Sequence, residues 1–167
     1  MTDAVDEFWL QNIRKYKEFD FKSITKGKVD LSKLGDKKDK DKSNKKINNK
    51  ISNLVALLKD ELKDSISDVI ISDRLIKSPV LLVAEESGMD INMEKLMKMH
   101  NQKTPDSKKI LEINSDHPMI MKIAENLNEF DHKKISQIVL DQANILDGNV
   151  LSNPSGYMES LTELFIK

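Results

Sequence analysis

Histidine, cysteine and glycine are the residues that most often build catalytic, metal-binding or phosphate-binding sites. The three histidines, His100, His117 and His132, share no metal-ligand spacing with one another or with nearby carboxylates. The sequence contains no cysteine, which excludes disulfides, thiol catalysis and thiolate metal sites. Its five glycines are scattered without forming a phosphate-binding loop, and no nucleophile motif is present. We therefore expect no catalytic residues, no metal site and no enzymatic activity, so function should depend on binding surfaces.

The segment Met89–His100, MDINMEKLMKMH, is the clearest candidate for a binding surface, because four of its twelve residues are methionine. Helical spacing would align four apolar side chains on one face and place Glu94, Lys95 and Lys98 on the other. The four residues are Met89, Met93, Leu96 and Met97. Such a stripe is either ordinary core, which methionine fills well, or an adaptable surface that binds many partners. Composition and spacing alone favour the core.

Composition indicates a water-facing, largely helical protein rather than one large compact core. Apolar residues make up 38% of the 167 residues and charged residues 33%. No apolar run approaches the roughly 20 residues that cross a membrane, and no signal-peptide pattern is present. We therefore expect a cytoplasmic protein without membrane contact.

The net charge of −1 is unevenly distributed, because residues 26–50 hold ten lysines and four aspartates. This segment has few apolar residues with which to offset its ordering entropy, and we interpret it as a solvated linker. An alternative is a small nucleic-acid-binding protein that uses this lysine-rich segment. The interleaved aspartates and the absence of aromatic residues that could stack on bases weaken that alternative.

Apolar periodicity predicts helices at both ends of the chain and a small sheet between them. Residues 3–16 show helical spacing through Phe8 and Trp9, and an extended piece with Phe19, Phe21 and Ile24 should end at Gly27. A strong helix is expected over Ile47–Leu62. Strands are expected at Val69–Ile71, Val80–Val83 and Lys109–Ile113, with helices covering both faces of their sheet.

The C-terminal third should form three helices. Asn114–Pro118 is a helix-start signal in which His117 should cap or pack, and the helix that follows should run to Leu127. Two apolar helices, Asp131–Leu146 and Pro154–Phe165, then close the chain around an Asp147–Asn149 turn. This hairpin suits a dimer seam, and packing on its own sheet is an equally good interpretation of the pattern.

Five short motifs follow one another along the chain. They are Asp3-x-Val5-Asp6-Glu7-Phe8, Ser72-Asp73-Arg74-Leu75-x-x-Ser78-Pro79, Met93-Glu94-x-Leu96, Leu111-Glu112-Ile113-Asn114-x-Asp116-His117-Pro118 and Leu140-Asp141-Gln142-Ala143. In this order they resemble one protein family, the ninety-kilodalton heat-shock chaperones in their bacterial HtpG form. The resemblance covers almost the whole chain and is weakest over residues 28–49.

The resemblance implies a C-terminal part of such a chaperone with an α+β fold. That fold has a small three-stranded sheet flanked by helices and a C-terminal helical hairpin that forms a four-helix-bundle dimer interface. Residues 1–25 would be the helical end of the middle domain, 26–46 a charged linker and 47–167 the dimerisation domain. The N-terminal domain that binds ATP and magnesium would be absent, so this chain would not be an ATPase.

The implied function is dimerisation and client binding by an ATP-dependent chaperone that assists protein folding under stress. The partners would be a second copy and unfolded client proteins, with no nucleic acid. No tetratricopeptide co-chaperone is expected, because the chain ends at Lys167 without an acidic pentapeptide. Client-binding residues would be Phe8, Trp9, Met89, Met93, Leu96 and Met97, although Met97 replaces an aromatic residue common in the family. Dimer-interface residues would be Ile135, Ile138, Val139, Gln142, Leu146, Tyr157, Met158, Leu161, Leu164 and Phe165.

Overall fold

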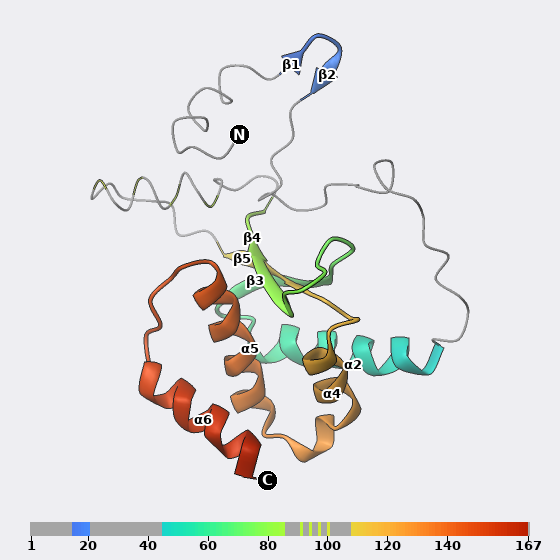
Figure 1. Cartoon of the computed structure of the whole chain (residues 1–167), viewed down its shortest axis with the longest axis vertical. Helices are drawn as coiled ribbons and strands as arrows, with labels where there is room; N and C mark the ends of the chain where they lie inside the picture. The colour runs from blue at the N-terminus through green and yellow to red at the C-terminus, as the bar shows by residue number, and fades with distance from the viewer. Residues whose placement is uncertain are drawn as a thin grey trace. The chain divides into compact units, whose positions relative to one another are not determined.

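A computed structural model describes residues 15–20, 45–85, 91, 94, 97, 100 and 108–166 of the chain (Figure 1). The chain divides into two compact units. One comprises residues 1–30 and 83–108, and the other comprises residues 31–82 and 109–167. We describe each unit by itself, beginning with the larger.

The larger unit is built on a three-stranded sheet in the order β3-β5-β4, where β3 is Ile66–Ile71, β4 is Val80–Val83 and β5 is Lys109–Ile113. Strands β3 and β5 are parallel, with Val69 opposite Leu111 and Ile71 opposite Ile113. The Asn114 N–H donates to the Pro79 carbonyl at 2.8 Å, which joins the end of β5 to the start of β4 as in an antiparallel pair. The three predicted strands are confirmed, and β3 begins three residues earlier than predicted.

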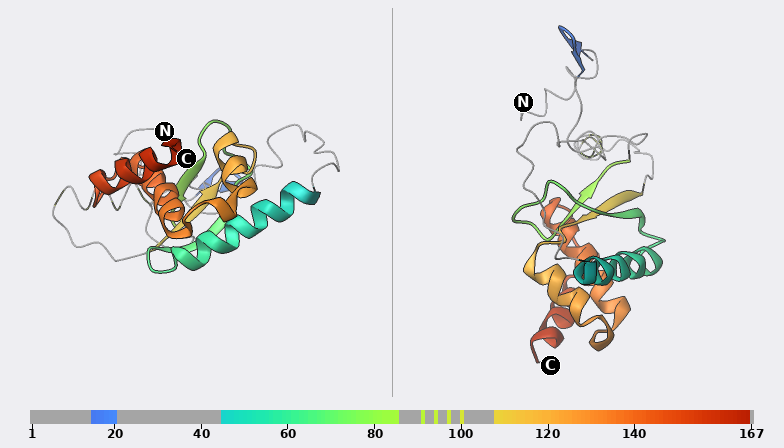
Figure 2. Two further views of the ribbon diagram at one scale, coloured as in Figure 1. Left: turned by 90° about the horizontal axis from the view of Figure 1, so that it is seen from below. Right: turned by 90° about the vertical axis from the view of Figure 1, so that its right-hand side faces the viewer.

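The described residues of this unit contain four α-helices, which confirm the helices predicted there. They are α2 (Lys45–Glu61), α4 (Pro118–Glu125), α5 (His132–Leu146) and α6 (Pro154–Ile166). Helix α4 ends two residues earlier than predicted, and the chain continues in a 3-10 turn over Leu127–Glu129. Figure 2 shows the sheet on one side of α2, α4 and α5, and α2 packs against β3, α4 and α5.

The core forms where the apolar stripe of α2 meets the sheet and the next two helices. Ile51, Leu54 and Leu58, spaced by three and four residues, are each at most 1% exposed. They belong to one buried cluster with strand residues Val69, Leu111 and Ile113 and helix residues Ile120, Ile135 and Val139. Burying each of these side chains stabilises the fold by about 1.5–3 kcal/mol. The core therefore explains why α2 forms although its N-terminal turn lies in the lysine-rich segment.

Capping hydrogen bonds mark the starts of α4 and α5, and the first confirms the helix start predicted at Asn114–Pro118. The His117 Nδ1 atom accepts from the Met119 N–H at 3.2 Å, directly before Pro118 in the first turn of α4. The Asp131 carboxylate accepts from the Lys134 N–H at 3.0 Å, and this bond lowers the pKa of Asp131. These caps supply acceptors for backbone N–H groups that have no partner within the helix.

A buried polar network fixes the loop that joins β3 to β4. The Arg74 guanidinium donates to both carboxylate oxygens of Glu112 at 2.9 Å, and Glu112 is only 4% exposed. The Ser72 hydroxyl donates to the same carboxylate and accepts from the backbone N–H of Leu75. The Asn114 side chain donates to the backbone carbonyls of Ile76 and Ser78. This network gives a structural reason for the Ser72–Pro79 motif noted in the sequence.

In the smaller unit, residues 15–20 form a β-hairpin of two short strands, β1 (Lys15–Tyr16) and β2 (Phe19–Asp20). The predicted N-terminal helix is therefore wrong at Lys15 and Tyr16. The physical reason is a tight turn at Lys17, whose backbone adopts a left-handed φ of 55° and reverses the chain. Residues 3–14 and 21–27 lie outside the described residues. Of the predicted linker, 26–46, only Lys45 and Lys46 are described, and both begin α2.

Candidate functional site

The terminal hairpin of α5 and α6 is the strongest candidate for an interaction surface. The two helices pack against each other (Figure 1) and are joined by a turn at Asp147–Asn153. Gly148 has a φ of +76°, and its N–H donates to the Ile145 carbonyl at 2.9 Å, which ends α5 as predicted. At the start of α6 the Asn153 side chain accepts from the Gly156 N–H at 3.0 Å.

The predicted interface residues fall into three groups by burial within one chain. Ile135, Ile138 and Val139 are at most 1% exposed, and Leu164 packs against the core, so these side chains face their own unit. Leu146 and Met158 are 51% and 57% exposed. Gln142, Tyr157 and Leu161 are partly buried, and the Phe165 side chain lies outside the described residues.

Further exposed apolar residues extend the surface beyond the predicted set. Ile145 is 47% exposed, Val150 in the turn 93% and Ile166 at the end of α6 78%. Ile145 lies in the predicted helix Asp131–Leu146 but was not among the predicted interface residues. Monomeric proteins rarely expose large apolar patches, so exposed apolar side chains on two adjacent helices mark a candidate binding face. We call Ile145, Leu146, Met158 and Ile166 the hairpin surface.

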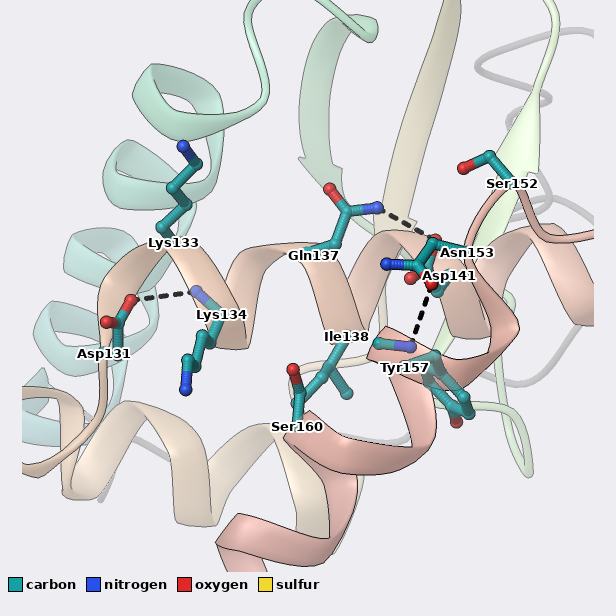
Figure 3. Close-up of a pocket in the computed structure, with 11 residues that line it drawn as sticks. Asp131, Lys133, Lys134, Gln137, Ile138, Asp141, Ser152, Asn153, Tyr157 and Ser160 are labelled. Atoms are coloured by element: carbon teal, nitrogen blue, oxygen red, sulfur yellow. Dashed lines mark hydrogen bonds between the residues drawn. The ribbon is translucent and has the colours of Figure 1, made fainter.

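A cleft of about 510 Å³ lies between α5 and α6 (Figure 3). Asp141 and Gln137 approach it from α5, and Asn153 and Tyr157 come from the start of α6. The complete lining is Asp131, Lys133, Lys134, Gln137, Ile138, Asp141, Ser152, Asn153, Gly156, Tyr157 and Ser160. The cleft was not predicted from the sequence, because it depends on how α5 and α6 pack against each other after the turn.

The cleft contains one buried carboxyl group, Asp141, which is 7% exposed. Burial raises the pKa of Asp141, and a hydrogen bond from the Gln137 amide at 2.9 Å opposes part of that rise. The available signal in the sequence was an acidic residue directly after the buried pair Val139 and Leu140. Two further buried polar atoms, the Ser136 hydroxyl oxygen and the side-chain amide oxygen of Gln142, have no hydrogen-bond partner in the described part of the chain.

An exposed ion pair joins α5 to α6 at the end of the hairpin that lies opposite the turn. The Lys134 ammonium lies 2.6 Å from the Glu163 carboxylate, linking the first turn of α5 to the last turns of α6. The hydrogen bond to Glu163 raises the pKa of Lys134. Because both side chains are about half exposed, solvent screens this pair and it adds little to stability.

The methionine-rich segment is described only at Ile91, Glu94 and Met97, which are helical, and at His100. Ile91 is 3% and Glu94 8% exposed, whereas Met97 is partly exposed. Glu94, predicted to lie on the face opposite the apolar stripe, is thus mostly buried. Residues three apart lie on the same face of a helix, so Ile91 and Glu94 mark the buried face of this segment. The predicted client residues Phe8, Trp9, Met89, Met93 and Leu96 lie outside the described residues.

The described residues present exposed apolar side chains on α5 and α6. Among them, no group of three histidine or acidic side chains is placed to hold a metal ion. Likewise, no helix within the described ranges is long and apolar enough to cross a membrane. The arrangement can bury apolar surface on the hairpin and exchange a proton at Asp141.

Comparison with known proteins gives the chain its family. A family model described as Hsp90 protein matches residues 1–167. The chaperone protein HtpG of Roseobacter denitrificans is 37% identical and covers 96% of this chain. The HtpG proteins of Psychrobacter arcticus and Nitrosomonas europaea are each 35% identical across the whole chain. The chain covers 27%, 26% and 26% of these three relatives, so it spans about a quarter of their length. The resemblance seen in the motifs is thereby confirmed, and the chain belongs to the Hsp90 family of chaperones.

Proposed function

We propose that this chain is the dimerisation and client-binding module of an ATP-dependent molecular chaperone in the cytoplasm. The observation that carries the proposal is the hairpin surface, where the apolar residues Ile145, Leu146, Met158 and Ile166 are 47–78% exposed on two adjacent helices. Family membership supports the chaperone part of the proposal.

A second copy of the chain is the occupant that best suits the hairpin surface. In a two-fold dimer each exposed residue is buried twice, once on each copy. Burying the exposed half of one leucine or methionine side chain contributes on the order of 1 kcal/mol. Four such residues on each of two copies give enough apolar burial to offset a substantial part of the entropy lost on association.

In this proposal the dimer serves the chaperone by tethering and the methionine-rich segment serves it by binding clients. Tethering two protomers at one end gives their remaining domains a high effective concentration for each other. ATP and magnesium would be held by other domains of the full-length protein. Clients would meet Met89, Met93, Leu96 and Met97 together with Phe8 and Trp9. Flexible methionine side chains suit a surface that must fit many different sequences.

The dimer part is tested by placing a charge on the hairpin surface. We expect Leu146→Glu and Met158→Glu each to dissociate the dimer, because a carboxylate buried in the seam would lack a partner. Both residues are more than half exposed within one chain, so the fold of the monomer should survive. Ile76→Glu is the matched control, since Ile76 is 89% exposed on the β3–β4 loop. Size-exclusion chromatography with light scattering reads the mass. Dimers of unchanged mass in both hairpin variants would contradict the seam.

The client part is tested by suppression of aggregation of a heat-denatured substrate protein. The double variant Met93→Asp, Leu96→Asp should suppress aggregation less than the wild type, because its predicted apolar stripe carries two charges. The double variant Lys95→Asp, Lys98→Asp alters the opposite predicted face and should retain suppression. Circular dichroism confirms that both variants are folded. Equal suppression by the first variant and the wild type would show that the stripe does not bind clients.

A further inference from the structure

The turn between α5 and α6 is tied to the sheet by a mostly buried ion pair. The Lys109 ammonium lies 3.3 Å from the Asp147 carboxylate, and the two side chains are 16% and 8% exposed. Lys109 is the first residue of β5, and Asp147 is the residue that follows the last residue of α5. The pair therefore connects the end of the hairpin's first helix to a strand 38 residues earlier in the chain.

The Asp147 carboxylate also organises the turn itself. The same oxygen that meets Lys109 accepts a hydrogen bond from the Asn149 side chain at 3.1 Å. The Asn149 amide also donates to the Asn144 side chain at 3.2 Å, and its backbone N–H donates to the Asn144 carbonyl at 2.9 Å. One carboxylate thus joins the sheet, the last turn of α5 and the first residues after it.

This turn, together with the packing of α6 against α5, sets where α6 lies. Leu146 precedes the turn and Met158 lies one helical turn into α6, so the hairpin surface combines residues from both sides of the turn. Gly148, between them, has a left-handed backbone and no atom within 4 Å of the place a Cβ would occupy. Side-chain packing therefore does not hold the backbone in place at Gly148. The side-chain hydrogen bonds of the neighbouring residue Asp147 restrain the turn instead.

We infer that Lys109 and Asp147 are positioning residues for self-association. Their ion pair holds the α5–α6 turn in the direction that brings the hairpin surface of both helices onto one face. The inference rests on the proposed dimer. A buried ion pair adds little net stability compared with apolar side chains of similar size, whereas it fixes orientation strongly. Its loss should therefore weaken association more than it weakens the fold, whose core lies in α2 and the sheet.

The test is a double-mutant cycle on the whole chain, read by sedimentation velocity over a range of concentrations. The variants are Lys109→Met, Asp147→Asn and the two combined. Asparagine keeps an acceptor for Asn149, and the combined variant leaves neither charge buried without a partner. We expect the dissociation constant of the combined variant to rise about tenfold, and the two single changes to be non-additive. Lys109→Arg keeps the charge and should stay within about twofold of the wild type.

A matched control separates positioning from general stability. Lys59 forms an ion pair with Asp68, 2.6 Å away, that links α2 to β3 and does not touch the turn. Lys59→Met should leave the dissociation constant unchanged, and circular dichroism of dilute samples should show every variant folded. If a single variant fails to fold, the charge-neutral combined variant still gives the decisive comparison.

Each outcome has one meaning. A combined variant that dimerises with wild-type affinity overturns the positioning role while leaving the proposed dimer intact. Equal weakening by Lys59→Met also overturns it, because the effect would then be general. A wild type that remains monomeric at every concentration rejects the proposed dimer itself, and the inference fails with it.

Discussion

At the scale of single residues, Asp141 shows how the hairpin places a charge where water is scarce. It follows two buried apolar residues on α5, and its only described hydrogen-bond donor is the neutral amide of Gln137. Burial raises the pKa of Asp141 above its unfolded value. A raised folded-state pKa favours the folded protein at low pH, and this contribution is lost as the pH rises through that pKa.

We predict that Asp141→Asn stabilises the protein at pH 7 and that the gain shrinks as the pH falls toward about 4, the ordinary aspartate pKa. Asparagine retains the acceptor for Gln137 and removes the charge that burial disfavours. Urea unfolding curves of wild type and variant at several pH values measure the difference. Asp131 has a lowered pKa and the opposite pH dependence, but it is present in both proteins and cancels. A gain of the same size at every pH would contradict this explanation.

Also at the residue scale, Glu112 neutralises a guanidinium that is itself mostly buried. Glu112→Gln should lower the free energy of unfolding by about 3 kcal/mol, because the charged pair with the mostly buried Arg74 would be lost. Urea unfolding measures this loss. Lys59→Ala removes one side of an exposed ion pair and serves as control, with an expected change below about 1 kcal/mol. Similar losses in the two variants would show that burial does not distinguish the pairs.

At the scale of elements, local rules in the sequence predicted most of the larger unit. Apolar spacing located α2 and α5, β-branched runs located β3 and β4, and polar residues before Pro118 and Pro154 located two helix starts. These features depend on neighbours within a few residues. The β1–β2 hairpin was missed because its reversal depends on Lys17, a residue type that does not signal a left-handed turn.

The turn at Gly148 gives the prediction at this scale. Gly148→Ala should destabilise the protein by about 1 kcal/mol, because alanine disfavours the left-handed backbone although nothing nearby would collide with its Cβ. Gly148→Asn should cost less, since asparagine tolerates this conformation. Thermal unfolding of both variants measures the order. Alanine as stable as glycine would show that the turn adopts another conformation in solution.

At the scale of the whole molecule, sequence motifs identified the family, whereas the candidate interaction surface could be identified only from the structure. Periodicity placed Ile135 and Val139 on the same apolar helix as Leu146, and only the packed structure shows the first two buried and the third half exposed. A single helix pattern cannot separate the face that meets its own sheet from the face that meets a partner. The cleft at Asp141 likewise depends on the relative placement of two helices.

The central claim is that two copies of this chain associate through the hairpin surface. Static light scattering of the purified chain, from below one to tens of micromolar, tests it most directly. Our account predicts a mass that rises with concentration to twice the 19.1 kDa of one chain, and a Leu146→Glu variant that stays at 19.1 kDa. A wild-type mass that remains at 19.1 kDa across the whole range would contradict it.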